Sequence, residues 1–547
     1  MLINRFQDLN LKGDIFGGVT TAIISLPLAL AFGVASGAGA EAGLWGAIMV
    51  GFFAALFGGS NTLISEPTGP MTVIMTAILT SMMAKYPETG LAMSFTVVIM
   101  AGIFQILLGT LKLGKYVTLM PYSVISGFMS GIGVILIILQ LSPLLGHSAP
   151  PGGVLGTITA LPTIFANISY NELLLGVLTL AVLFFFPKQY RKFVPAQLVA
   201  LIAVTLLSVF LFDTDSIRRI GEIPAGLPSL IIPNFNSEML TAMVIDALVL
   251  GTLGCIDTLL TAVIGDSLTR KEHDSDKELR GQGIANVISG LFGALPGAGA
   301  TMGTVTNIQV GAQSPLSGIV RALVLALVVL VAGGLTEPIP MAVLAGIAVY
   351  VGFNILDWSF IQRAHKVSLQ SMAIMYGVMF LTVFVDLIVA VGLGVFISNI
   401  IIIEQLSRAQ ARQVKAISDA DNDLPLTDNE RAILERANGK VLFFYLSGPM
   451  IFSVSKAISR QHTSISDYQV MILDLSDVPM IDVTVGLALE NAIKDALDAY
   501  CEVLLLCPHL DTRKRLQKLN VLSLIDSDNH CTSREQALKL ALSHVSR

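Results

Sequence analysis

Apolar runs, each about 20 residues long, alternate along the first part of the chain with short stretches rich in glycine, proline and charge. A helix needs a run of about this length to cross a bilayer. The first seven runs lie near residues 14–34, 41–59, 68–84, 91–111, 117–145, 171–187 and 195–212, and the second seven near 239–265, 281–294, 301–312, 315–334, 339–356, 369–386 and 387–404. The pattern predicts an α-helical polytopic membrane protein with 14 transmembrane segments.

Each set contains an odd number of runs, so the second set must enter the membrane with the opposite orientation. Such a 7+7 inverted repeat is typical of secondary transporters. The third run of each set is also short and follows an interruption, "SEPTGPM" before 68–84 and "LPGAGATMG" before 301–312. Interruptions at matching places point to the binding site of a transporter.

The loops of this arrangement differ in basic charge. One side carries 14 Lys and Arg and the other carries 3. By the positive-inside rule the first side, with both termini, is cytoplasmic. It receives Arg5, Lys12, Lys112, Lys115, Lys188, Arg191, Lys192, Arg270, Lys271, Lys277, Arg280, Arg321, Arg363 and Lys366; the other receives Lys85, Arg218 and Arg219. Residues 1–10 lack the layout of a cleaved signal peptide, so we expect the first span to be retained.

Composition supports a membrane protein with a soluble tail. The chain is 54% hydrophobic and 13% charged, against roughly 25% charged residues in soluble domains. Of the 33 Lys and Arg, 17 lie in the first 404 residues and 16 in the last 143. The net charge of −6 gives no reason to expect nucleic acid as a partner. The four cysteines form no CxxC pair, so neither disulfides nor a structural metal are expected.

The tail reads as a small α/β domain. The stretches "KVLFFYLSGPMIF", "YQVMILDLSDV" and "EVLLLCP" have the apolar character of strands, and "TVGLALENAIKDALDAY" has helical periodicity. We therefore divide the chain into a transmembrane domain over 1–404, a linker over 405–437 and a cytoplasmic domain over 438–547.

Asp257 stands near the middle of the run 239–265. A carboxylate at that depth costs about 3 kcal/mol on insertion scales, so it marks a functional site by default. Thr261 follows four residues later and shares its helix face. Carboxylate and hydroxyl oxygens suit a hard cation. In the alternative readings, Asp257 only bonds a neighbouring helix and Thr261 only bonds the carbonyl of its own preceding turn.

The two interruptions offer helix starts. "GAGAT" (297–301) and "EPTGP" (66–70) each lead into a helix whose free amides favour an anion, and their unpaired carbonyls suit sodium. Close helix packing through small residues is the alternative. We expect Glu66 to support the site from behind the ligands.

No nucleophile motif, Walker loop or dinucleotide fingerprint occurs, so we expect neither an enzyme nor a bound cofactor.

These stretches, with "GDIFGGVT", "LALAFGVASGAGAEAGLWGA", "KLGKYVTLMPYSVISGFMSGIG", "CIDTLLT" and "LSGPMIF", resemble the SulP family of anion transporters along the whole chain, most of all its cyanobacterial sodium-dependent bicarbonate branch. The resemblance implies a core domain (spans 1–4 and 8–11) that moves against a gate domain (spans 5–7 and 12–14) in an elevator-type cycle. It also implies a STAS domain in the tail, through which two copies form a homodimer, and a bacterial inner membrane location.

The resemblance further implies that sodium is held by Asp257, Thr261 and the backbone of Gly299, Ala300 and Thr301. Bicarbonate would lie at Thr68, Ala300 and Thr301. Many family members carry an arginine just inside the tenth span, where this chain has Gly303. A bound sodium would replace that positive charge, which favours symport over simple anion exchange.

One position in the tail has a regulatory parallel. In related soluble anti-sigma antagonists a phosphorylatable hydroxyl follows an aspartate by two positions, as Thr484 follows Asp482 here. The favoured alternative is that Thr484 caps a helix.

Sodium-coupled bicarbonate import is therefore the leading expectation for function. A sulfate or dicarboxylate transporter of the same fold, coupled to protons or sodium, remains open because helix-end amides do not distinguish small oxyanions. A third possibility is a motor or signalling protein whose membrane part no longer transports.

Overall fold

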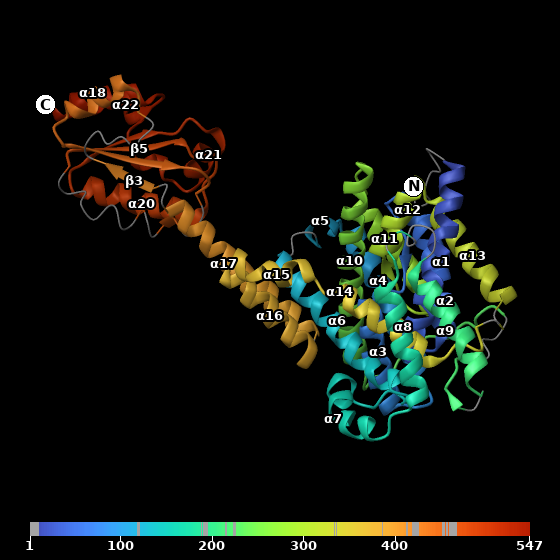
Figure 1. The fold of residues 1–547 in the computed structure, drawn as a ribbon. Helices are drawn as coiled ribbons and strands as arrows, with labels where there is room; N and C mark the ends of the chain where they lie inside the picture. The colour runs from blue at the N-terminus through green and yellow to red at the C-terminus, as the bar shows by residue number, and fades with distance from the viewer. Residues whose placement is uncertain are drawn as a thin grey trace. The chain divides into compact units, whose positions relative to one another are not determined.

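The computed structural model describes residues 10–117, 121–187, 189, 195–213, 216–221, 226–332, 334, 336–385, 387–411, 414–417, 426–450, 454–455, 458 and 468–546. The expectations for residues 1–9, for Lys188, Arg191 and Lys192, and for much of the linker lie outside them. The chain forms two compact units, 1–397 and 398–547, which are described separately (Figure 1).

The first unit is helical, and each predicted span corresponds to one helix. The first set comprises α1 (Leu11–Ser36), α2 (Ala40–Phe57), α3 (Gly69–Lys85), α4 (Gly90–Thr110), α6 (Tyr122–Leu144), α8 (Tyr170–Phe185) and α9 (Ala196–Leu211). The second comprises α10 (Leu240–Thr269), α11 (Ser275–Leu291), α12 (Thr301–Gln309), α13 (Leu316–Ala332), α14 (Met341–Ile355), α16 (Leu369–Phe384) and α17 (Leu387–Ala411). The predicted α-helical fold class is confirmed, and these 14 helices are consistent with the predicted 7+7 arrangement.

Helix length varies widely among these spans. Within the described residues, 6 helices are long and apolar enough to cross a membrane individually, including α1, α4 and α10.

Three further helices were not predicted: α5 (Gly114–Val117), α7 (Gly153–Ala166) and α15 (Trp358–Val367). The axes of α7 and α8 differ by 117°. These segments escaped the apolar pattern because α5 has only 4 residues, α7 contains Pro162, and α15 carries polar residues on one side.

The two interrupted segments meet each other. Strand β1 (Ser65–Glu66) precedes α3, strand β2 (Ala298–Gly299) precedes α12, and the two pair antiparallel. The backbone N–H of Ala300 extends the pairing by donating to the carbonyl of Ile64 at 2.7 Å. Backbone in a membrane interior must find hydrogen-bond partners within the protein. The two halves of the repeat therefore satisfy each other where their helices are broken.

Side chains hold the second interruption in place. The amide of Asn286 accepts from the N–H of Gly297 at 2.9 Å and donates to its carbonyl at 3.0 Å. Gln282 donates to the same carbonyl at 2.8 Å. A Cβ atom at position 297 would lie 2.6 Å from the carbonyl oxygen of Glu66, so glycine is needed where the segments cross.

Arg321 was assigned to a cytoplasmic loop, and that assignment is wrong. It lies within α13 and its side chain is fully buried. The guanidinium forms an ion pair with Glu66 and donates to the carbonyl of Ser65 at 3.1 Å. It also donates to the carbonyl of Ala47 at 3.3 Å and to the hydroxyl of Ser25 at 2.9 Å. One buried cation thus links α1, α2 and α13 to the first interruption.

The second unit confirms the predicted α/β domain. Its sheet has the order β3-β4-β5-β6-β7, with only β3 antiparallel to its neighbour. Helices cover both faces, as expected for a largely parallel sheet. The strands are β3 (Val414–Ile417), β4 (Val441–Ser447), β5 (Val470–Asp477), β6 (Glu502–Leu506) and β7 (His530–Cys531); the helices are α18 (Asp428–Glu435), α20 (Val483–Asp498), α21 (Leu510–Lys518) and α22 (Arg534–Val545).

Two details of this unit differ from what the pattern suggested. Strand β3 lies inside the predicted linker and pairs with β4. The expected cap role of Thr484 is wrong, because Asp482 is the N-cap of α20 and its side chain accepts from the N–H of Val483 at 2.5 Å. Thr484 lies exposed in the first turn of the helix.

We predict that Arg321→Gln lowers the stability of the membrane unit by about 3 to 5 kcal/mol, because it leaves the Glu66 carboxylate buried without its cation. Thermal denaturation of the detergent-solubilised protein, followed by size-exclusion fluorescence, measures the change. The control is Arg408→Gln, which removes an ion pair to Glu404 whose side chains are 75% and 54% exposed. Equal melting temperatures for the two variants would contradict the prediction.

Candidate functional site

Asp257 lies within α10, an unbroken helix of 30 residues. Its Oδ2 accepts a hydrogen bond of 2.8 Å from the hydroxyl of Thr68. Thr68 is the N-cap of α3, and its side chain makes no capping bond to its own helix. Asp257 has no ion-pair partner among the described residues, and only one of its carboxylate oxygens has a hydrogen bond there. The carboxylate therefore stands beside the start of α3 with capacity to bind a cation.

Thr261 lies one turn further along α10 and is almost fully buried. Its hydroxyl donates to the carbonyl of Gly299 at 2.9 Å, and its oxygen is 3.0 Å from the hydroxyl oxygen of Thr301. The alternative in which Thr261 bonds the carbonyl of its own preceding turn is therefore not observed. Thr261 instead ties α10 to the second interruption and the start of α12.

The backbone from Gly299 to Thr301 is pressed against α10. The N–H of Gly299 donates to the hydroxyl of Thr258 at 3.1 Å. A Cβ atom at Gly299 would lie 3.1 Å from the Cα of Thr258 and 3.2 Å from the Cβ of Thr261, so a side chain there would be tightly confined. Ala300 is the N-cap of α12, and Thr301 is its exposed first residue. All five residues expected at a cation site thus lie on or beside one face of α10.

Glu66 has a different partner from this group. Its carboxylate pairs with Arg321 of α13. A Cβ atom at Gly303 would lie 3.6 Å from Oε1 of Glu66. An arginine at position 303 would thus adjoin Glu66, whereas in this chain the cation beside Glu66 comes from α13. Sequence reasoning missed Arg321; the signal was a lone charge inside the apolar run "LSGIVRALVLALVVL".

The electrostatics suit a cation and an anion side by side. Helices α3 and α12 both begin at the crossing, so the free amides and partial positive charges of two N-termini lie there. Asp257 contributes the negative charge. Oxygen ligands from the carboxylate, the Thr261 hydroxyl and backbone carbonyls fit a hard cation, and the helix starts fit a small anion.

A crevice of about 610 Å³ opens beside α12. Met302 and Thr306 of α12 line it, so it reaches the first turn of that helix. Among the described residues that line it, none is Asp, Glu, Lys or Arg. The remaining lining residues are Thr20 and Ile24 of α1, Pro195, Ala196 and Gln197 at α9, Gln309 and Val310, and Tyr350 of α14.

Known proteins share this architecture. The sequence profile of the Sulfate permease family matches residues 11–378, and that of the STAS domain matches residues 432–537. The Bicarbonate transporter BicA of Picosynechococcus sp. is 56% identical over 545 residues, 99% of this chain and 96% of its own length. BicA of Synechocystis sp. is 58% identical over 541 residues, again 99% and 96%.

A solved structure agrees with these matches. The transmembrane domain of a cyanobacterium bicarbonate transporter BicA superposes with a TM-score of 0.69 at 61% identity, covering 72% of this chain and 100% of that one. With interrupted helices, a multi-pass membrane unit and a C-terminal α/β domain all in place, the chain belongs to the Sulfate permease family of membrane transporters and carries a STAS domain.

Proposed function

We propose that this chain is a secondary active transporter that couples sodium entry to bicarbonate import. The observation that carries the proposal is the meeting of Asp257 and Thr261 with the starts of α3 and α12 at one place. The two relatives at 56% and 58% identity, both bicarbonate transporters by name, support the choice of anion.

Sodium binds at Asp257, Thr261 and the backbone of Gly299, Ala300 and Thr301 in this proposal. The Thr261 hydroxyl already contacts the carbonyl of Gly299, so these oxygens lie within reach of one ion. The negative charge of the Asp257 carboxylate offsets the hydration free energy that a cation loses when it leaves water. Sodium in turn lowers the cost of keeping Asp257 ionised in the membrane interior.

Bicarbonate binds at Thr68, Ala300 and Thr301. Each threonine hydroxyl has a single proton, so Thr68 donates to bicarbonate in place of its present bond to Asp257, and the helix starts behind the two threonines add partial positive charge. Bound sodium supplies the positive charge that faces the anion. Each ion therefore raises the affinity for the other, which is the thermodynamic requirement for coupled binding.

Transport follows from movement of a core domain (α1–α4 and α10–α13) against a gate domain (α6, α8, α9, α14, α16 and α17). The crevice beside α12 supports this division, since α1 and α12 form one wall and α9 and α14 the other. An elevator-type shift of the core carries the site across the membrane.

Both termini face the cytoplasm of a bacterial inner membrane, and the STAS domain pairs two copies into a homodimer. Thr484, exposed at the start of α20, is the candidate for regulatory phosphorylation.

A second cargo deserves direct comparison, because the matched family is named for sulfate permeases. Purified protein in liposomes is assayed for uptake of labelled bicarbonate, sulfate and succinate, each with and without an inward sodium gradient. We expect bicarbonate uptake that depends on sodium. Uptake of sulfate or succinate instead would replace the proposed cargo, proton-driven uptake would replace the coupling ion, and no uptake of any anion would favour a signalling role.

We predict that Asp257→Asn abolishes sodium-stimulated uptake while the protein still folds, because the amide keeps the shape of the side chain and its bond with Thr68 but loses the charge. Uptake in liposomes and thermal stability in detergent measure the two effects. Asp246→Asn, on the same helix, is the control and should retain sodium stimulation. Unchanged transport in Asp257→Asn would remove Asp257 from the sodium site.

Thr261→Val should raise the sodium concentration for half-maximal uptake by about tenfold, since one oxygen ligand is lost at a cost near 1.4 kcal/mol. Thr252→Val, exposed on the same helix, is the matched control. If the two variants show the same sodium dependence, Thr261 serves only to join α10 to β2 and α12.

Deleting residues 412–547 should shift the solubilised protein toward monomers while its remaining uptake stays sodium-dependent. This cut removes β3 together with the sheet to which it belongs and leaves α17 intact. Light scattering measures the mass, and liposome uptake measures the coupling. A fully dimeric truncated protein would place the contact in the membrane unit, and sodium-independent uptake would show that the STAS domain takes part in coupling.

A further inference from the structure

The crevice of about 610 Å³ beside α12 is lined by two buried polar side chains of the proposed gate domain. Gln197 lies in the first turn of α9 and is 6% exposed. Tyr350 lies in α14 and is 8% exposed. Polar groups buried to this degree normally have hydrogen-bond partners inside the protein, so the partners of these two decide whether the crevice can hold a ligand.

The hydroxyl of Tyr350 is available to a ligand. The backbone carbonyl of Tyr350 accepts from the side-chain amide of Asn354 at 2.9 Å, and its ring packs edge-on against Phe184 with 5.2 Å between the centroids. Neither contact involves the hydroxyl, which has no hydrogen-bond partner among the residues that the structure describes. A phenolic O–H can donate to an anion.

The side-chain amide of Gln197 is bonded only weakly. Its Nε2 donates to the Sδ of Met302 at 3.8 Å, and a thioether sulfur is a weak acceptor. Its Oε1 has no hydrogen-bond partner within the described part of the chain. Gln197 therefore presents a donor and an acceptor side by side, and each is free to form a stronger bond.

The amide of Gln197 lies against the first turn of α12, where the anion is proposed to bind. Met302 follows Thr301 directly and is 43% exposed. A methionine side chain is flexible and moves at little cost. Hydrogen bonds to an ionised oxygen are about twice as strong as those between neutral groups. An anion at the start of α12 would therefore take the place of the Met302 sulfur as the acceptor for Gln197.

The crevice offers hydrogen bonds without charge. Among its described lining residues none is Asp, Glu, Lys or Arg, and Thr20 and Thr306 add two hydroxyls to those already named. The free energy of taking an ion out of water rises with the square of its charge. Neutral groups therefore favour a singly charged anion over a doubly charged one such as sulfate.

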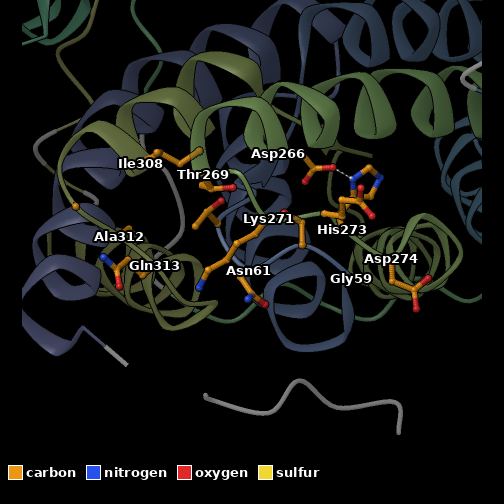
Figure 2. Close-up of a pocket in the computed structure, with 14 residues that line it drawn as sticks. Gly59, Asn61, Asp266, Thr269, Lys271, His273, Asp274, Ile308, Ala312 and Gln313 are labelled. Atoms are coloured by element: carbon orange, nitrogen blue, oxygen red, sulfur yellow. Dashed lines mark hydrogen bonds and ion pairs between the residues drawn. The ribbon is translucent and has the colours of Figure 1, made fainter. Parts of the chain in front are cut away.

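A cavity at the ends of α10 and α12, of about 450 Å³, provides a contrast. Figure 2 shows Asp266 facing His273 there, with 2.6 Å between Oδ2 and Nδ1. The Nε2 of His273 lies 2.9 Å from the hydroxyl of Ser275, and Asp274 accepts from the backbone N–H of Lys277 at 3.0 Å. These side chains bond to neighbouring groups of the protein, whereas Gln197 and Tyr350 have bonding capacity to spare.

We propose that Gln197 and Tyr350 form the gate's half of the anion site and that Gln197 selects bicarbonate by its proton. The N–H of the Gln197 amide donates to one oxygen of bicarbonate, and the O–H of bicarbonate donates to Oε1 of the same amide. Tyr350 donates to one of the two unprotonated oxygens. Nitrate and sulfate have no proton at neutral pH, so one of their oxygens would face the amide oxygen without a hydrogen bond between them.

This inference rests on the proposed function and names the residue that decides its cargo. The core supplies Thr68, Thr301 and the helix starts, and the gate supplies the amide and the phenol. Because the core moves past α9 and α14 in the proposed cycle, the anion has both sets of contacts only while the site lies at this crevice.

The test uses the full-length protein in liposomes and measures sodium-driven uptake of labelled bicarbonate with nitrate as competitor. Nitrate is planar and singly charged like bicarbonate but has no proton. Gln197→Met keeps the length of the side chain and removes both hydrogen-bonding groups. Gln309→Met is the matched control, because Gln309 lines the same crevice but is exposed. Tyr350→Phe is compared with Tyr376→Phe, which lies in α16 and is 39% exposed.

The wild-type protein should have a Ki for nitrate at least about tenfold above its KM for bicarbonate, roughly the discrimination that one hydrogen bond provides. Gln197→Met should raise the KM for bicarbonate by about tenfold and change the Ki for nitrate by less than about threefold, so the ratio of the two constants falls toward one. Tyr350→Phe should raise both constants alike, because its hydroxyl donates to an oxygen that both anions have. Both controls should behave like the wild type.

Two results would overturn the proposal. The first is an unchanged ratio of Ki to KM in Gln197→Met, which would make Gln197 only a part of the crevice wall. The second is a wild-type protein that transports bicarbonate but binds nitrate equally well. If Gln197→Met does not fold, Gln197→Asn, which withdraws the amide by one methylene, must lower the ratio in the same way. A wild-type protein that takes up no bicarbonate at all is a distinct result, because it removes the proposed cargo together with the role of Gln197.

Discussion

Backbone polar groups in the middle of a membrane must be paired inside the protein, because no water is present there to bond them. Each half of the repeat breaks one helix, and each break exposes amides and carbonyls. Pairing β1 with β2 satisfies them mutually, with Asn286 and Gln282 completing the set around Gly297. The same pairing brings the starts of α3 and α12 together. The ion site is therefore a consequence of how two broken helices share hydrogen bonds.

Charge inside the membrane unit is divided between two roles. Arg321 and Glu66 neutralise each other and bind the first break to α1, α2 and α13. Asp257 has no such partner among the described residues. Its bond from Thr68 orients the carboxylate without cancelling its charge. The Arg321–Glu66 pair therefore stabilises the fold, whereas the Asp257 carboxylate can bind an ion.

A linear pattern was enough to predict the fourteen apolar segments, the two interruptions, the placement of Asp257 and Thr261 on one helix face, and the α/β character of the tail. These features follow from periodicity and from residues one or two turns apart, which a linear pattern records. Four other features depend on how the chain folds. Arg321 lies in the interior of the membrane unit, and Thr261 bonds Gly299 and not its own helix. Asp482 and not Thr484 caps α20, and β3 joins the sheet from within the predicted linker. Arg321 and Glu66 are 255 positions apart, and β1 pairs with a strand more than 200 residues away. A hydrogen bond or ion pair of that kind depends on where packing brings two distant segments, so no local pattern contains it.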